Sequence, residues 1–209
     1  MADLRCPVCA AASPVPSAVK SGVPYWRCPE CEAVFAGNLD PAIIMTHNDA
    51  PETRADAEAQ KTRLRRLDQH FGKRPERVLD FGCGRGDYVA FLKGQGIDAV
   101  GVDQDTETQL SDFAPKSFDA INMVEVIEHL PNPYDILQKL ADLLTPGGII
   151  YIESSFADFI GNPVTSSYVD PAIGHCCIHS RRSMAYLGWK LRVDLAWINN
   201  NVAVLRKST

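Results

Sequence analysis

The segment that most restricts how this chain can fold runs from Arg77 to Val102, where apolar strand patterns flank a glycine-rich loop and a helix pattern. "RVLDFG" is a short apolar strand, and "DYVAFLKGQG" places Tyr88, Phe91 and Leu92 on one helical face. "DAVGVDQD" then forms a second apolar strand. Continuous apolar strands separated by amphipathic helices are typical of parallel sheets that are covered on both faces. The sequence therefore predicts an α/β domain with a doubly wound, mostly parallel sheet.

The same alternation continues towards the C-terminus. "FDAINMV" is a third strand, "NPYDILQKLADLL" is an amphipathic helix, and "GIIYIESS" is a fourth strand; Pro146, Gly147 and Gly148 are expected to end the helix. "KLRVDLAWI" and "VAVLRK" instead alternate with period two on either side of three asparagines. We therefore expect a Rossmann-like sheet that ends in a C-terminal antiparallel hairpin.

The composition limits the class of protein. At 209 residues and 45% hydrophobic, the chain can bury one good core and carry a small appendage. No apolar run is long enough to cross a bilayer, and "MADLRCPVCA" lacks the zones of a secretory signal, so we expect a cytoplasmic protein without a membrane partner. A net charge of -5 argues against a protein that mainly coats nucleic acid.

Four of the seven cysteines form two matched C-x-x-C pairs, with eighteen residues between them. In a chain without an export signal this spacing predicts a zinc ribbon, with iron as the main rival metal, whereas disulfides or a redox motif fit less well. The expected ligands are Cys6, Cys9, Cys28 and Cys31. Four thiolates leave no open coordination position, so the metal should be structural.

The segment that follows is highly charged. Leu64, Leu67 and Phe71 recur there at helical spacing, which predicts a connecting amphipathic helix. We interpret its arginines as a solvated helix face, with a phosphate contact as the alternative; they are Arg63, Arg65 and Arg66. The predicted domains are a zinc ribbon at 1–40, a helical linker at 41–75 and an α/β domain at 76–209.

The glycine-rich loop predicts a ligand site. In a doubly wound sheet the ligand lies beyond the carboxyl ends of the strands, and Gly82, Gly84 and Gly86 would let the backbone approach it. Asp103, 21 positions after Gly82, follows the second strand, where a carboxylate can accept hydrogen bonds from ribose hydroxyls. The spacing is G-x-G-x-G and Asp80 precedes it, which favours a cationic, phosphate-free ligand over a dinucleotide. S-adenosylmethionine has this chemistry.

Three segments, "VLDFGCGRG", "VGVDQD" and "FDAINMVEVIEHLPNPYDILQKLADLLTPGGIIYIESS", resemble the motifs of class I S-adenosylmethionine-dependent methyltransferases over residues 76–206. "EVIEHL" and "TPGG" are similar to the small-molecule, ubiquinone-biosynthesis type. The resemblance implies cofactor contacts from Asp80, Gly82, Gly84, Gly86 and Asp103, and from the backbone around Met123 and Val124.

The chain departs from that family between Asp103 and Phe118, which are too close for the usual helix and strand. We expect the helix to be missing, Asp112 and Phe113 to flank the adenine, and the sheet to have six strands with one exposed edge. A partner subunit in a homodimer, or the zinc ribbon, would cover that edge. Weak cofactor binding is the other expected consequence.

Two histidines are candidate catalytic residues. His129 in "EVIEHL" lies where the family's pocket opens and is a candidate base, although a hydrogen bond at a helix start explains it equally well. "GHCCIHS" resembles the loop that faces the acceptor, so His175 is expected to shape the pocket while Cys176 and Cys177 pack; a second metal site that includes His179 is the alternative.

Ser180 is expected to cap the last helix. Three aromatic residues are interpreted as core rather than pocket: Tyr168, Trp189 and Trp197.

The resemblance implies a methyltransferase that uses S-adenosylmethionine and acts on a small molecule, such as a metabolite or a sugar-like compound. Methyl transfer by in-line displacement mainly requires that donor and acceptor are held collinear in a dry pocket. An RNA or protein acceptor recruited by the ribbon is the first alternative. The second is a catalytically inactive, zinc-dependent interaction module.

Overall fold

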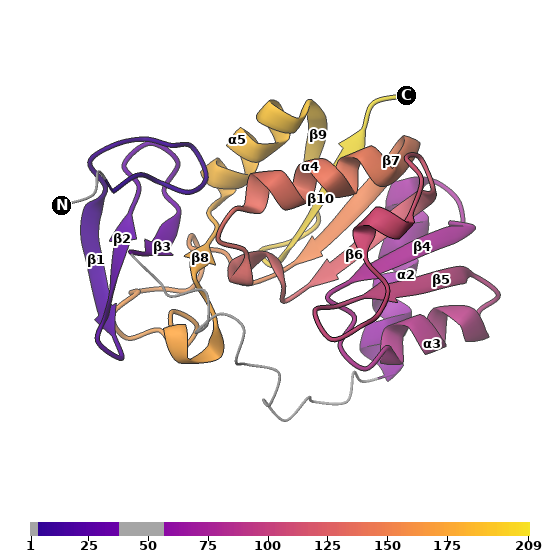
Figure 1. Cartoon of the computed structure of the whole chain (residues 1–209), viewed down its shortest axis with the longest axis horizontal. Coiled ribbons are helices and arrows are strands. Elements are labelled where there is room, and N and C mark those ends of the chain that lie inside the picture. The colour runs from indigo at the N-terminus through magenta and orange to yellow at the C-terminus, as the bar shows by residue number, and fades with distance from the viewer. Residues whose placement is uncertain (1–3, 38–56) are drawn as a thin grey trace.

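A computed structural model describes residues 4–37 and 57–209. The main sheet has six strands in the order β5-β4-β6-β7-β10-β9 (Figure 1). Their bounds are β4 (Arg77–Phe81), β5 (Asp98–Val102), β6 (Phe118–Val124), β7 (Leu144–Glu153), β9 (Val193–Trp197) and β10 (Val202–Lys207). The first four in spatial order pair in parallel, and β10 pairs antiparallel with both β7 and β9. The predicted doubly wound sheet with a reversed terminal hairpin is confirmed.

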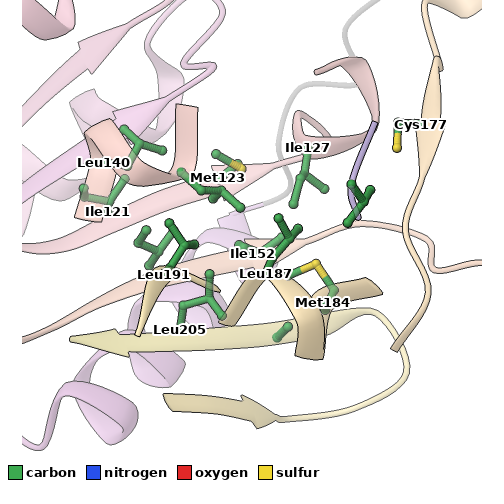
Figure 2. Close-up of a cluster of buried hydrophobic side chains, with 14 of the residues drawn as sticks. Ile121, Met123, Ile127, Leu140, Ile152, Cys177, Met184, Leu187, Leu191 and Leu205 are labelled. Carbon is green, nitrogen blue, oxygen red and sulfur yellow. The ribbon is translucent and has the colours of Figure 1, made fainter. Parts of the chain in front are cut away.

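Helices cover both faces of this sheet. They are α2 (Ala57–Phe71), α3 (Asp87–Gly94), α4 (Pro133–Leu143) and α5 (Arg181–Leu191). Because side chains alternate along a strand, Ile150 and Ile152 of β7 face the cluster of α4 and α5, while Ile149 and Tyr151 face that of α2 and α3. Figure 2 shows the first cluster, where Met184 and Leu187 of α5 lie close to Ile152.

The helix boundaries follow from capping chemistry. Ser180 caps α5 as expected, since its side chain accepts the Ser183 N–H at 2.9 Å. The end of α4 differs from the prediction, because β7 begins at Leu144 directly after the helix. The Pro-Gly-Gly segment is therefore part of the strand. A Cβ at Gly148 would lie 3.1 Å from the Asp119 carbonyl oxygen, so this glycine permits close strand pairing.

The connection from β5 to β6 is short, as the sequence predicts. In the described chain it contains one helical turn, η1 (Leu110–Asp112), and no α-helix. β5 is consequently an edge strand. The ribbon lies at the opposite end of the molecule from β5 (Figure 1), so the prediction that the ribbon covers this edge is wrong. Cover by a partner subunit stays a prediction.

The N-terminal ribbon forms a second sheet. Its own strands are β1 (Val15–Lys20), β2 (Val23–Arg27) and β3 (Val34–Ala36), and they pair antiparallel. A fourth strand, β8 (Cys177–Ile178), comes from the connection between β7 and α5 and pairs with β3. The predicted boundary at residue 40 and the first part of the predicted linker lie outside the described residues.

Within residues 4–37 and 57–209, no helix combines the length and apolar character needed to cross a membrane.

Candidate functional site

The glycine-rich loop follows β4 and has a left-handed backbone at each of its glycines. The φ angles are 80° at Gly82, 51° at Gly84 and 81° at Gly86, a region that side chains disfavour. A Cβ at Gly82 would lie 2.2 Å from Cγ2 of Val126, whereas a Cβ at Gly86 would meet open space. Gly82 therefore has no room for a side chain beside the turn after β6, and its role in ligand approach stays a prediction.

Asp103 lies at the end of β5 and contacts the same loop. Its carboxylate accepts the Gly84 N–H at 2.8 Å and the Gln104 N–H at 2.7 Å. Each oxygen keeps a further lone pair, which can accept a hydroxyl. A hollow of about 350 Å³ opens beside the loop, lined by Cys83, Gly84, Arg85, Gly86, Val89, Ala90, Lys93, Gly101 and Thr106.

Asp80 is buried beneath the loop. The Asn122 side-chain amide of β6 donates to its Oδ1 at 2.5 Å. Burial raises the pKa of Asp80 to about 6, although the Asn122 hydrogen bond and the positive charge of Arg63 lower it. The hydrogen bond from Asn122 and the charge of Arg63 therefore offset only part of the cost of burying the Asp80 charge. The predicted backbone contacts lie alongside, because Met123 pairs with Phe81 in the parallel register.

The arginines of α2 differ from the prediction. The Arg63 side chain is only 12% exposed, lies over the Tyr88 ring at 4.8 Å and comes within 3.8 Å of Glu153. Its buried Nε has no hydrogen-bond partner among the described residues. Arg66 donates to the Tyr151 hydroxyl at 3.0 Å. The solvated-face interpretation is wrong for these two arginines.

A sequence signal for Arg63 was present. It lies four positions before Leu67, which is fully buried, and residues at that spacing share one helix face. Arg65 does lie on the exposed face, where it donates to Thr62. The arginines contact Glu153 and Tyr151 of β7. The sequence did not indicate these two partners, because the periodicity of a strand does not identify which helix will cover it.

A second cluster follows β6. The turn after this strand includes Glu125, with a φ of 50°, and then η2 (Ile127–His129). Three possible metal ligands converge here: Glu128, His129 and His175. Each offers one ligand atom, and these three atoms lie within 4.8 Å of one another. Nε2 of His175 is 3.9 Å from Oε1 of Glu128, and the two histidine rings are 4.7 Å apart between centroids. The fold thus brings both predicted catalytic histidines together with Glu128, which the sequence reasoning did not select.

Hydrogen bonds determine the proton position on His175. Its Nδ1 lies 2.7 Å from the Tyr168 carbonyl oxygen, which can only accept, so Nδ1 carries the proton and Nε2 has a free lone pair. Burial lowers the pKa of His175 to about 4, and the ring is therefore neutral near pH 7.

The Tyr168 hydroxyl lies between two carboxylates. It is 3.1 Å from Oε2 of Glu125 and also within hydrogen-bonding distance of Glu128. Burial raises the pKa of Glu128, whose other oxygen accepts the Ser154 hydroxyl at 3.0 Å. Tyr168 thus belongs to the site rather than only to the core, contrary to the favoured interpretation. The carboxylate of Glu128 and one nitrogen each from His129 and His175 form a set that could hold a divalent cation.

The "GHCCIHS" segment divides between site and core. His175 joins the cluster, while Cys176, Cys177 and His179 are buried. Among the described residues, no group of possible metal ligands includes these last three. The expectation that the two cysteines pack is met.

The four ribbon cysteines converge. Sγ of Cys6 is 3.5 Å from that of Cys31, and Sγ of Cys9 is 3.5 Å from that of Cys28. The sulfurs of a tetrahedral zinc–thiolate site lie roughly 3.8 Å apart, whereas a disulfide would bring them to about 2 Å. The hydrogen bond from Cys31 lowers the pKa of Cys6, which favours the thiolate form that a metal ion requires. The arrangement fits one tetrahedral metal ion.

The raised pKa of Asp80 gives a stability prediction. Its ordinary pKa is 3.8, so the folded chain holds this proton more tightly than the unfolded chain, and stability falls as the pH rises from about 4 through about 6. We expect Asp80→Asn to raise the free energy of unfolding by about 3 kcal/mol at pH 8 and to leave it unchanged below about pH 4. Denaturant titrations at both pH values measure this difference. The exposed-site control Asp194→Asn should change stability by less than about 0.5 kcal/mol, and an equal gain in the control would contradict the assignment.

Comparison with known proteins gives a consistent result. The model of a family described as "Methyltransferase domain" matches residues 52–191. Ubiquinone biosynthesis O-methyltransferase of Aliivibrio fischeri (strain MJ11) is 26% identical over 149 residues, which cover 56% of this chain. The match spans 64% of the length of that relative.

Solved structures share the fold. 1,6-Didemethyltoxoflavin-N1-methyltransferase of Burkholderia thailandensis, solved with 1,6-didemethyltoxoflavin and S-adenosylhomocysteine, superimposes with a TM-score of 0.63 at 18% identity, covering 93% of this chain and 100% of that one. A SAM-dependent methyltransferase of Archaeoglobus fulgidus superimposes with a TM-score of 0.56 at 20% identity, covering 72% of this chain and 94% of that one.

Because the family model matches more than half of the sequence, this chain belongs to the methyltransferase domain family, as a class I S-adenosylmethionine-dependent member.

Proposed function

We propose that this protein transfers the methyl group of S-adenosylmethionine to a hydroxyl oxygen of a small acceptor molecule. The observation that carries the proposal is the contact between Val126 and Gly82, because it joins the glycine-rich loop to the Glu128–His129–His175 cluster at one edge of the sheet. Family membership supports methyl transfer, and the printed activity of the ubiquinone-biosynthesis relatives supports an oxygen acceptor.

The charges around the loop fit this donor. S-adenosylmethionine carries a carboxylate, an ammonium and a sulfonium. The positive charge of Arg63, whose Nε lies 3.8 Å from Oε2 of Glu153, suits the ligand carboxylate, and the buried Asp80 suits the positive charges. Asp103 would bind the ribose hydroxyls through its remaining lone pairs. The open space at Gly86 leaves the backbone accessible to the ligand.

The reaction itself requires little covalent chemistry from the protein. The acceptor oxygen forms a bond to the methyl carbon as the carbon–sulfur bond breaks, and the acceptor proton must leave. Glu125 is placed to take this proton, because partial burial of its carboxyl and the charge of the neighbouring Glu128 raise its pKa to about 8. The protein's main contribution is to hold donor and acceptor in line.

The acceptor hydroxyl also needs to be oriented. We propose that Glu128, His129 and His175 hold a divalent cation for this purpose, since three protein ligands leave positions open for an acceptor. A bound cation would act as a Lewis acid and lower the pKa of a coordinated hydroxyl. The lone pair on Nε2 of His175 is available because Nδ1 donates to Tyr168. This arrangement favours acceptors with neighbouring oxygen atoms that can chelate.

The cysteine cage is proposed to bind structural zinc. Soft thiolates select zinc over hard cations, so the two proposed metal sites should differ in selectivity.

For the cofactor, we expect Asp103→Ala to weaken S-adenosylmethionine binding by about 1.5 to 3 kcal/mol, because charge-assisted hydrogen bonds are lost. Isothermal calorimetry measures the dissociation constant. The nearby Glu107→Ala should bind normally, and an unchanged constant for Asp103→Ala would refute the role of this aspartate.

For the cation, we expect the wild-type chain to bind Mn²⁺ and Glu128→Gln to bind it about 100-fold more weakly, because a charged ligand is lost. Electron paramagnetic resonance of free Mn²⁺ measures binding, and Mn²⁺ is chosen because the thiolate cage prefers zinc. Glu107→Gln is the control. Equal binding by wild type and Glu128→Gln would exclude a cation at this cluster.

For the zinc, we expect purified protein to contain about one zinc per chain and Cys28→Ser to contain almost none, because three thiolates leave the cage incomplete. Elemental analysis measures this content. Cys83→Ser, outside the cage, should keep the metal. Full zinc retention in Cys28→Ser would rule out the cage.

A further inference from the structure

The connection from β7 to β8 carries one side of the proposed acceptor site but has little regular structure of its own. Residues 154–176 contain a single helical turn, η3 (Pro171–Ile173). A connection of this length normally needs outside contacts to hold one conformation. Such contacts must come from other elements of the chain, and near His175 they come from the ribbon and from the turn after β6.

The backbone of Cys176 joins the ribbon to the acceptor site directly. Its N–H donates to the Glu128 carbonyl oxygen at 2.9 Å, and its carbonyl oxygen accepts the Ala36 N–H at 2.9 Å. Pairing of Val34 with Ile178 and of Phe35 with Cys177 then continues the ribbon sheet through β8. One residue therefore lies between the ribbon and the turn that carries Glu128.

Tyr25 of β2 adds a side-chain contact at the neighbouring position. Its hydroxyl donates to the His175 carbonyl oxygen at 2.6 Å, and the residue is fully buried. Burial raises the pKa of Tyr25, so the phenol remains a neutral donor. The peptide unit after His175 is thus held on both sides: its carbonyl by Tyr25 and its N–H, that of Cys176, by Glu128.

The metal cage is connected to the same region. The Ser180 hydroxyl, which caps α5, donates to the carbonyl oxygen of Cys31 at 2.6 Å. Cys6, Cys28 and Cys31 also belong to the hydrophobic cluster that contains Ile127 of η2. Figure 2 shows that this cluster extends from the sheet and α5 to Cys177 of β8.

We propose that the zinc ribbon is a positioning element of the acceptor site, in which the β3 edge and Tyr25 hold His175 against Glu128. The inference rests on the proposed roles of the cysteine cage and of His175. A ribbon of this size needs its metal to fold, so loss of zinc should release the His175 segment while the cofactor half of the site remains intact. The ribbon would then act on acceptor binding and chemistry rather than on the donor.

Hydrogen–deuterium exchange of the full chain, resolved by mass spectrometry, tests this. In Cys28→Ser we expect faster exchange in residues 174–180 and 127–130 but not in β6. In Tyr25→Phe we expect zinc content and S-adenosylmethionine affinity to be unchanged, with about tenfold faster exchange at Cys176, because a buried carbonyl loses its donor. Tyr134→Phe, which removes a hydroxyl bonded to Gln138 on α4, is the matched control and should match wild type.

The outcomes separate this inference from the proposed function. Hydrogen–deuterium exchange can be measured without an acceptor and without added cation. The positioning role can therefore be tested even in a chain that shows no methyl transfer. Wild-type protection of residues 174–180 in zinc-free Cys28→Ser, or in Tyr25→Phe, would overturn the positioning role. Where methyl transfer is measurable, Tyr25→Phe should lower kcat about tenfold with an unchanged KM for the donor, and an equal effect of Tyr134→Phe would also overturn the proposal.

Discussion

The parallel pairing of β4 with β6 is the constraint on which both halves of the site depend. It places Asp80 opposite Asn122, where a buried hydrogen bond joins the two strands, and Phe81 opposite Met123. The loop after β4 and the turn after β6 therefore leave the sheet side by side. Gly82 then has no room for a side chain, since Val126 occupies that space. A one-residue shift in this register would separate the loop from the turn and move buried side chains to the other face.

The two halves of the site receive their outer walls from different parts of the chain. α2, which precedes the sheet, supplies Arg63, whose positive charge acts on Asp80. The ribbon, which precedes α2, contacts the segment that carries His175 through β8 and Tyr25. Each wall thus comes from a segment N-terminal to the sheet. The sheet supplies Asp80, Asp103 and the turn with Glu128.

Local patterns predicted much of the fold. The amphipathic helix around Leu67, the absent helix after Asp103 and the cap at Ser180 each depend on neighbouring residues, and all three are confirmed. The strand β7 began earlier than predicted because pairing with β6 extends through the Pro-Gly-Gly segment. Arg63 differs from the prediction because it shares the buried face of the helix with Leu67 and packs over Tyr88.

The sequence by itself determined the class of fold, the spacing of the four cysteines and the loop with its two aspartates, because each is encoded within a few neighbouring positions. Only the tertiary structure decided that Glu128, His129 and His175 meet, and that β8 completes the ribbon sheet. Those contacts join segments far apart in the chain, and local propensity carries no information about which distant segments will pair. The ribbon, β8 and the sheet domain share one hydrophobic cluster, which is formed by residues from all three parts of the chain.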